Sequence, residues 1–268
     1  MTGSLSALRG LTPRVIAVDL DGTLVPQSGG VPEGVAEAIE RVQSAGAHVV
    51  AATGRSLSTT GYVAREAGMH EYAVVSNGAM IVTVDPEEVV EVRTFDASDL
   101  LQELSALLSR ATFAVERTDG VFLTTRHFVD PGVALDIREV AFDDLIAEPV
   151  VRVIVRSDEH LDTGLSPVLG HLDMHSIAFG VTDVAWFDLG IKGVTKATGL
   201  QTLCGRLGVA ADEVLAIGDS MNDIEMLQWA GTSVAMGSAR PAIQAVADHV
   251  TGATPGAGVI EVLDLLYT

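Results

Sequence analysis

The chain has 268 residues, 48% of them hydrophobic and 4% aromatic, and its 36 acidic residues outnumber 16 basic ones, giving a formal charge of -20. This length and apolar content exclude large-scale disorder and suit one large α/β domain or two smaller domains. The acidic surplus leaves no basic face for a nucleic-acid partner.

The sequence contains no membrane or export signal that we recognise. No apolar run is long enough for a signal peptide or a membrane span, so we expect a soluble, cytoplasmic protein with no membrane partner. The single cysteine, Cys204, cannot form an internal disulfide, which fits a reducing compartment, and we interpret it as a small core residue. The sequence contains no coiled-coil heptads, so it does not indicate an oligomeric state.

The first part of the chain alternates short apolar segments with helical ones. We predict strands at 15–19, 48–53 and 72–77, and helices at 33–45 and 57–67. Pro32 suits the start of the first helix, and Gly46 and Gly68 suit the two helix ends. This order is typical of a doubly wound parallel sheet, in which ligands lie beyond the carboxyl ends of the strands.

The pattern changes near residue 83. The segment TVDPEEVVEVRTF predicts a hairpin with its turn at Asp-Pro-Glu-Glu. It is followed by helices near 98–110, 133–141 and 159–170, and by apolar segments or strands at 112–116, 121–125, 150–156, 175–179 and 184–188. We therefore predict an inserted α+β domain over residues 84–187, with an antiparallel sheet.

The doubly wound pattern then resumes. Helices are predicted at 194–207, 222–229, 240–247 and 258–266, and strands at 213–219, 232–236 and 248–251. Residues 1–83 and 188–268 would thus share one Rossmann-like parallel sheet. The predicted fold class is α/β, a doubly wound core with an inserted α+β domain.

Two carboxylates follow the first strand. In VIAVDLDGTLV, Asp19 and Asp21 stand one residue apart before Gly22. They could form a capped turn of solvated acids, or they could act as a nucleophile and an acid/base partner with separate environments. Thr23 could bind an anion through its hydroxyl and backbone N–H groups.

A second acidic segment, GDSMND, follows the strand at 213–219. Asp219, Asn222 and Asp223 offer three side-chain oxygens within five residues, which suits Mg²⁺. Their alternative role is to cap a helix. Because Asp19 and Asp21 should lie at the same sheet edge, we favour a cation site.

Other polar residues stand at strand or helix ends. Thr53, with Gly54 and Arg55, is a candidate phosphate contact or a plain helix cap. Lys196 begins a predicted helix, where a positive charge opposes the dipole, and a lysine can bind phosphate as a point charge. The other lysine, Lys192, suits a loop. Ser76 and Asn77 end a strand and could form a turn or face a substrate.

Four segments together resemble the motifs of the haloacid dehalogenase-like superfamily, in the order found in its phosphatases. They are Asp19-Leu-Asp-Gly-Thr-Leu, Thr53-Gly-Arg, Lys196 and Gly218-Asp-Ser-Met-Asn-Asp. Ser76-Asn-Gly-Ala and Ala235-Met-Gly strengthen the likeness to its Cof-type branch, which carries a large α/β cap between the second and third motifs. The resemblance covers nearly the whole chain.

The resemblance implies catalytic roles for several of these residues. Asp19 would be the nucleophile that forms an aspartyl-phosphate, and Asp21 would protonate the leaving oxygen and then deprotonate water. Thr53, with Gly54, and Lys196 would hold the phosphoryl oxygens.

It also implies a Mg²⁺ site. The ligands would be the Asp19 side chain, the Asp21 backbone carbonyl and Asp219, with Asn222 and Asp223 in support. Arg55, Ser76 and Asn77 are the candidates on the substrate side of this site.

Some segments depart from the family's pattern. The segment DLGIKGVTK lacks the usual proline, Ala-Met-Gly-Asn reads Ala235-Met-Gly-Ser238, and Asp-Gly-Val reads Gly256-Ala-Gly-Val259. These departures leave the reaction in place and bear on the substrate. In the inserted domain, Arg117, Arg126 and Arg152 could touch an anionic substrate, but we interpret them as solvated surface arginines.

The leading hypothesis is a Mg²⁺-dependent phosphatase acting on small phosphorylated metabolites, with sugar phosphates the favoured class. One alternative is a phosphomannomutase-like phosphotransferase, which would pass the phosphoryl group to a sugar. A second alternative is a non-catalytic module that binds a sugar phosphate. Free phosphate as the product would separate the first hypothesis from both alternatives.

Overall fold

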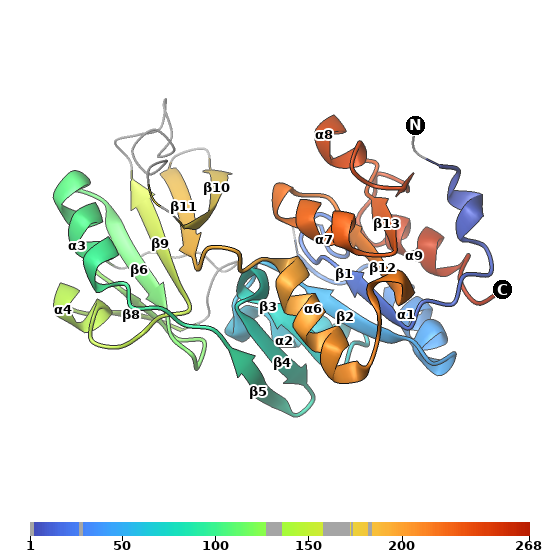
Figure 1. Ribbon diagram of the computed structural model, residues 1–268, viewed down its shortest axis with the longest axis horizontal. Coiled ribbons are helices and arrows are strands. Elements are labelled where there is room, and N and C mark those ends of the chain that lie inside the picture. The colour runs from blue at the N-terminus through green and yellow to red at the C-terminus, as the bar shows by residue number, and fades with distance from the viewer. Residues whose placement is uncertain (1–2, 27–28, 127–135, 158–171, 173, 182–183) are drawn as a thin grey trace. The chain divides into compact units, whose positions relative to one another are not determined.

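The computed structural model describes residues 3–26, 29–126, 136–157, 172, 174–181 and 184–268 (Figure 1). Its internal contacts divide the chain into two units. The first comprises Met1–Gly54, Thr60–Glu91 and Thr195–Thr268, and the second comprises Arg55–Thr59 and Val92–Val194. The first unit is built from the two ends of the chain and carries the motif segments except for Arg55.

The first unit contains an eight-stranded sheet in the order β14-β13-β12-β1-β2-β3-β4-β5. Its strands are β1 (Val15–Val18), β2 (His48–Ala52), β3 (Tyr72–Val75), β4 (Met80–Val84), β5 (Glu87–Val92), β12 (Val214–Gly218), β13 (Thr232–Ala235) and β14 (His249–Val250). Strands β14 to β3 are parallel, and β4 is antiparallel to β3. All four residues of β1 are buried, as expected for a central parallel strand. The predicted fold class is confirmed.

Helices cover both faces of this sheet. They are α1 (Val35–Ser44), α2 (Leu57–Glu66), α6 (Lys196–Leu207), α7 (Ile224–Trp229), α8 (Pro241–Gln244) and α9 (Ala257–Leu263), with 3-10 turns η1 (Leu5–Leu8), η2 (Ser76–Gly78), η3 (Ala211–Glu213) and η4 (Met221–Asp223). Alternate residues of β1, Val15 and Ala17, pack in one core with apolar residues of α6, α7 and α8. Helices α1 and α9 contact each other on the other face (Figure 1).

The second unit contains a six-stranded sheet in the order β10-β11-β9-β6-β7-β8. Its elements are α3 (Ser98–Leu107), β6 (Thr112–Glu116), β7 (Phe122–Thr124), β8 (Ile137–Glu139), α4 (Phe142–Leu145), β9 (Arg152–Ser157), β10 (His175–Val181) and β11 (Val184–Gly190). Leu101 and Leu104 of α3 pack against Phe113 and Val155 in the core on one face of the sheet. The spacing of these leucines places them on one side of the helix.

The structure differs from the sequence-based expectations in two places. The hairpin predicted at 83–95 forms from β4 and β5. It extends the first sheet, whereas we had expected it within the inserted domain. Residues 137–139, within a predicted helix, form β8, because pairing with β7 in parallel register overrides local helix propensity. The helix predicted at 159–170 lies outside the described residues. The assignment of residues 84–187 to an inserted domain stays a prediction.

No helix in the described part of the chain has both the length and the apolar character that crossing a bilayer requires.

A buried ion cluster lies on the face of the second sheet opposite the α3 core. The Arg152 guanidinium contacts Glu116 at 2.7 Å and Asp188 at 2.8 Å, and Trp186 donates its indole N–H to the other Asp188 oxygen at 2.8 Å. Burial by itself would lower the pKa of Arg152, but the two carboxylates outweigh it and raise this pKa. The interpretation of Arg152 as a solvated surface residue is therefore wrong.

Replacing Arg152 by Met should destabilise the fold. The change leaves the Glu116 and Asp188 carboxylates buried without a cation. Breaking a buried ion pair in this way lowers the free energy of unfolding by ~3–5 kcal/mol. The matched control is Arg138→Met, which breaks an exposed pair with Asp136 and should leave the unfolding free energy unchanged. Urea unfolding of both variants measures the difference; equal midpoints would contradict a structural role for the cluster.

Candidate active site

Polar residues gather where three neighbouring strands of the first sheet end. Asp19 follows β1, Thr53 follows β2 and Asp219 follows β12, and β1 lies between the other two strands. The Asp19 N–H donates to the carbonyl of Ile217 at 3.0 Å, which extends the strand pairing up to the carboxylate. In a parallel sheet these ends share one edge, where ligands bind.

A buried lysine joins two of the predicted acids. Lys196 is the first residue of α6, and its Nζ atom donates to Asp19 Oδ1 and to Asp223 Oδ1, both at 2.6 Å. The side chain of Lys196 is fully buried, and those of Asp19 and Asp223 are 6% and 0% exposed. An ammonium group in such a place needs anionic partners, because burial of an unpaired charge is costly.

The charges shift the pKa values of this group. Burial raises the pKa of Asp19 well above its usual value, and the carboxylates of Asp223 and Asp219 add to the effect, while Lys196 opposes it. Burial by itself would lower the pKa of Lys196, but Asp19 and Asp223 outweigh it and raise this pKa. Lys196 therefore stays an ammonium ion at neutral pH.

The second oxygen of Asp223 is also occupied. It accepts from the backbone N–H groups of Asp219 at 3.0 Å and Ser220 at 2.9 Å. A Cβ atom at Gly218 would lie 2.6 Å from the Asp223 carboxyl carbon, so the close approach requires glycine. Asp223 is thus held at both oxygens, and it in turn fixes Lys196 and the backbone of Asp219 and Ser220 that leads into η4.

Asp219 is oriented by the chain that follows β1. Thr23 Oγ1 donates to Asp219 Oδ1 at 2.9 Å. Gly22 has φ +88°, and a Cβ atom there would lie 2.6 Å from Asp219 Oδ2. Burial raises the pKa of Asp219, and the Asp223 carboxylate adds to the rise, whereas the bond from Thr23 opposes it.

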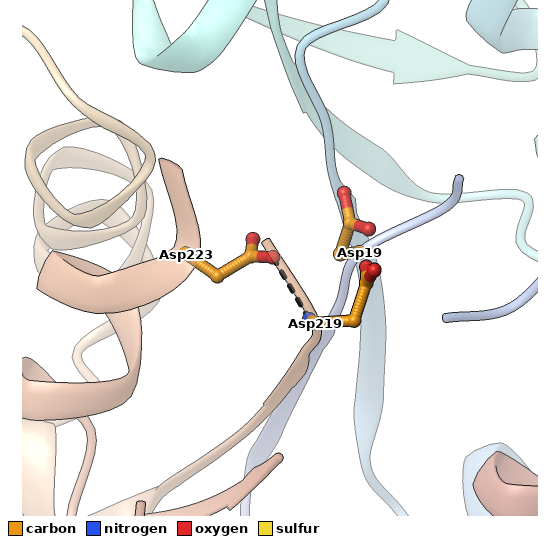
Figure 2. A group of neighbouring side chains, drawn as sticks. All are labelled: Asp19, Asp219 and Asp223. Carbon is orange, nitrogen blue, oxygen red and sulfur yellow. Dashed lines mark hydrogen bonds between the residues drawn. The ribbon is translucent and has the colours of Figure 1, made fainter. Parts of the chain in front are cut away.

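The carboxylates are arranged for a divalent cation. Asp19, Asp219 and Asp223 each offer an oxygen, and these oxygens lie within 4.8 Å of one another (Figure 2). Three carboxylates against one ammonium leave two negative charges in excess when all are ionised. Hard oxygen donors with an excess of negative charge fit Mg²⁺.

Asp21 lies apart from this cluster. Its side chain is exposed, and the turn that follows is closed by the Gly22 N–H, which donates to the Val25 carbonyl at 2.8 Å. Asp19 and Asp21 therefore occupy separate environments, one buried beside an ammonium and one in contact with solvent.

Thr53, Asn77 and Asn222 form a second group at the same edge. Thr53 is buried, and its carbonyl accepts the Asn77 N–H at 3.0 Å. Asn222 donates through Nδ2 to Asn77 Oδ1 at 2.9 Å. Arg55 donates to the Thr59 carbonyl at 3.3 Å. Lys192 is exposed, as expected of a loop residue.

Three contacts were missed from the sequence. The sequence did not reveal that Lys196 and two backbone N–H groups also bind the oxygens of Asp223. The supporting role of Asp223 at a metal stays a prediction. The Thr23 hydroxyl was expected to bind an anion, and it donates to Asp219 instead. Ser76 and Asn77 form the turn η2, one of the two alternatives given for them, and the bond from Asn222 to Asn77 was not foreseen. Their place on the substrate side stays a prediction. Two signals in the sequence had pointed to Lys196: lysine occurs only twice in the chain, and this lysine begins a predicted helix, where a positive charge opposes the dipole.

Comparison with known proteins gives the family. The model of haloacid dehalogenase-like hydrolases matches residues 16–263. The chain belongs to the haloacid dehalogenase-like hydrolase family. This membership confirms the resemblance stated from the motifs and the expectation of a hydrolytic enzyme.

Similar proteins cover nearly the whole chain. The chain is 26% identical over 261 residues to the 5-amino-6-(5-phospho-D-ribitylamino)uracil phosphatase YitU of Bacillus subtilis, covering 94% of this chain and 96% of that one. It is 32% identical over 246 residues to a phosphoglycolate phosphatase of Methanopyrus kandleri, with 91% and 93% covered. The phosphatase BT1666 of Bacteroides thetaiotaomicron superposes with a TM-score of 0.75 at 26% identity, over 94% of each chain.

Removing the Thr23 hydroxyl should weaken metal binding. Thr23→Val keeps the side chain's shape but leaves Asp219 without its donor, and loss of such a partner lowers metal affinity roughly 10-fold. Electron paramagnetic resonance of Mn²⁺ titrated into the protein measures the dissociation constant. Thr202→Val, on α6, is the control and should bind Mn²⁺ like the unmodified chain. Equal affinity for Thr23→Val would contradict the role of this hydroxyl.

Cys204 should react slowly in the folded protein. Burial raises the pKa of its thiol to about 11 from 9.0. At pH 8 the reactive thiolate is then about 100-fold scarcer than in the unfolded chain, since each pKa unit is tenfold. The rate of iodoacetamide labelling should be low when folded, rise with pH towards 11, and be high in urea. Fast labelling of folded protein at pH 8 would contradict a buried core thiol.

Proposed function

We propose that the protein is a Mg²⁺-dependent phosphatase that hydrolyses small phosphorylated metabolites, with sugar phosphates the favoured class, through an aspartyl-phosphate on Asp19. One observation carries this proposal. The Asp19 carboxylate is buried at the mouth of a parallel sheet, 2.6 Å from the Lys196 ammonium and within 4.8 Å of two further carboxylates. Phosphoryl transfer requires a nucleophile, a contact for the anion, ligands for a cation and exclusion of water, and this arrangement can supply all four.

In the first step, an oxygen of Asp19 attacks phosphorus, and the bond from phosphorus to the leaving oxygen breaks. Asp21, as a carboxylic acid, gives its proton to that oxygen. Asp21 is exposed, so it can exchange protons with solvent between steps. The alcohol part of the substrate leaves and the phosphoryl group stays on Asp19.

In the second step, Asp21 acts as a carboxylate and takes a proton from water. The water oxygen attacks phosphorus, and the bond between phosphorus and Asp19 breaks, which releases phosphate. Asp21 ends the cycle protonated and Asp19 ionised. One residue thus serves as acid and then as base, which an environment apart from Lys196 permits.

The anionic phosphoryl group requires positive charge and fixed donors. Lys196 supplies a permanent ammonium, and Thr53 with Gly54 lines the same sheet edge. Because Asp223 holds Lys196 from the other side, the ammonium is in position before substrate binds. Preorganised charge of this kind is the main contribution of a protein to phosphoryl transfer.

The residues fit a bound Mg²⁺. The Asp19 and Asp219 side chains and the Asp21 carbonyl would hold it, with Asn222 and Asp223 in support. When bound, the cation supplies charge that offsets repulsion between the attacking carboxylate and the phosphate.

Similar proteins support the substrate class. The relatives reported above are named for phosphoribitylaminouracil and phosphoglycolate hydrolysis, and both substrates are small. We propose that residues 84–187 select the substrate, since the residues assigned to the cation and the phosphoryl group all lie in the first unit.

Replacing the nucleophile should abolish turnover. Asp19→Asn keeps the shape of the side chain, but an amide is a poor nucleophile, so kcat should fall at least ~1,000-fold. Phosphate release from a panel of sugar phosphates and para-nitrophenyl phosphate measures this.

The control is Asp212→Asn, an exposed acid in η3 before β12, which should keep full activity. EDTA should silence the unmodified enzyme and Mg²⁺ should restore it. Residual activity of Asp19→Asn above about one part in a thousand, with normal circular dichroism, would rule out Asp19 as the nucleophile.

A further inference from the structure

The turn that follows β3 has an unusual backbone. Ser76, Asn77 and Gly78 have consecutive positive φ values of +50°, +55° and +98°. Side chains other than glycine adopt this region at a cost, and asparagine tolerates it better than most. Ser76 and Asn77 are also nearly buried, at 4% and 7% exposed. A strained, buried polar turn persists only where surrounding contacts hold it.

Asn77 connects two segments of the candidate site. Its N–H donates to the Thr53 carbonyl at 3.0 Å, and its Oδ1 accepts from Asn222 Nδ2 at 2.9 Å. A Cβ atom at Gly54 would lie 3.0 Å from Asn77 Oδ1 and 3.4 Å from Asn222 Nδ2. The absence of a side chain at Gly54 therefore leaves room for the two amides to meet.

The next residue of the turn contacts a third segment. A Cβ atom at Gly78 would lie 1.9 Å from the Thr195 carbonyl oxygen, and one at Gly199 would lie 2.9 Å from Gly78 Cα. The turn thus packs directly on the first turn of α6, whose first residue is Lys196. One three-residue turn touches the segments that carry Thr53, Asn222 and Lys196.

We propose that Asn77 is a positioning residue that orients Asn222 toward the cation site. Since Asn222 gives its amide N–H to Asn77, its carbonyl oxygen, a hard ligand, is left to face the metal or a metal-bound water. Asn77 acts through Asn222 and the Thr53 segment and makes no contact with substrate, in place of the substrate-side role predicted from sequence. The inference rests on the proposed function only for its kinetic consequence.

The test removes the Asn77 amide while sparing the backbone. Asn77→Gly keeps the positive φ accessible but leaves Asn222 without its acceptor. The Mn²⁺ dissociation constant, from electron paramagnetic resonance, should rise roughly 10-fold. The Mg²⁺ concentration for half-maximal rate should rise alike, while substrate KM at saturating Mg²⁺ changes less than about 2-fold. Asn77→Asp, which keeps an acceptor oxygen, should restore most of the affinity.

A double-mutant cycle identifies the partner. If Asn77 acts through Asn222, Asn222→Ala should weaken Mn²⁺ binding, and adding Asn77→Gly should weaken it no further. Additive losses would overturn the proposal, as would an unchanged Mn²⁺ affinity or a raised substrate KM in Asn77→Gly alone. If Asn77→Gly does not fold, Asn77→Ala, which also lacks the acceptor oxygen, takes its place in the cycle.

The metal titration also separates this inference from the proposed function. A chain that hydrolyses no phosphate ester, yet shows the non-additive loss of Mn²⁺ affinity, would refute the phosphatase and keep the positioning role. An active phosphatase whose two variants show additive losses of Mn²⁺ affinity would support the proposed function and refute the positioning role.

Discussion

The contact on which the site depends is the buried ammonium of Lys196 between Asp19 and Asp223. Lys196 lies 177 positions after Asp19 in the chain and 27 positions before Asp223. Without the ammonium, two carboxylates would be buried side by side with no positive charge. With it, Asp19 has a fixed direction, and the second oxygen of Asp223 binds the two N–H groups of Asp219 and Ser220, which precede η4.

Glycine makes these approaches possible. Gly218 admits the Asp223 carboxylate, Gly22 admits Asp219, and Gly78 admits the start of α6. At each of these positions a Cβ atom would lie within 2.6 Å of a neighbouring atom. The geometry of the motifs therefore depends both on the glycines, which allow close approach of the backbone, and on the acids, which carry the charge. The Asn77 turn extends the same principle to Thr53 and Asn222.

Much of the fold followed from the sequence because parallel sheets impose strong rules. Continuous apolar segments such as 15–18 predict central strands, and polar residues after such strands must share an edge. Hydrogen-bond partners did not follow, because Thr23, Asp223 and Asn77 could each satisfy several donors or acceptors. The predictions for residues 137–139 and Arg152 were wrong for a related reason. Pairing with β7 makes residues 137–139 a strand, and the Glu116 carboxylate on a neighbouring strand allows Arg152 to be buried.

Trapping the covalent intermediate tests the central claim most directly. In Asp21→Asn, para-nitrophenyl phosphate should still phosphorylate Asp19, because para-nitrophenolate leaves without a proton, while hydrolysis slows for lack of a base. Sodium borohydride added during turnover reduces an aspartyl-phosphate to homoserine, which peptide mass spectrometry locates. The account predicts homoserine at position 19. An unchanged Asp19 in protein that is turning over substrate, or homoserine at another aspartate, would contradict it.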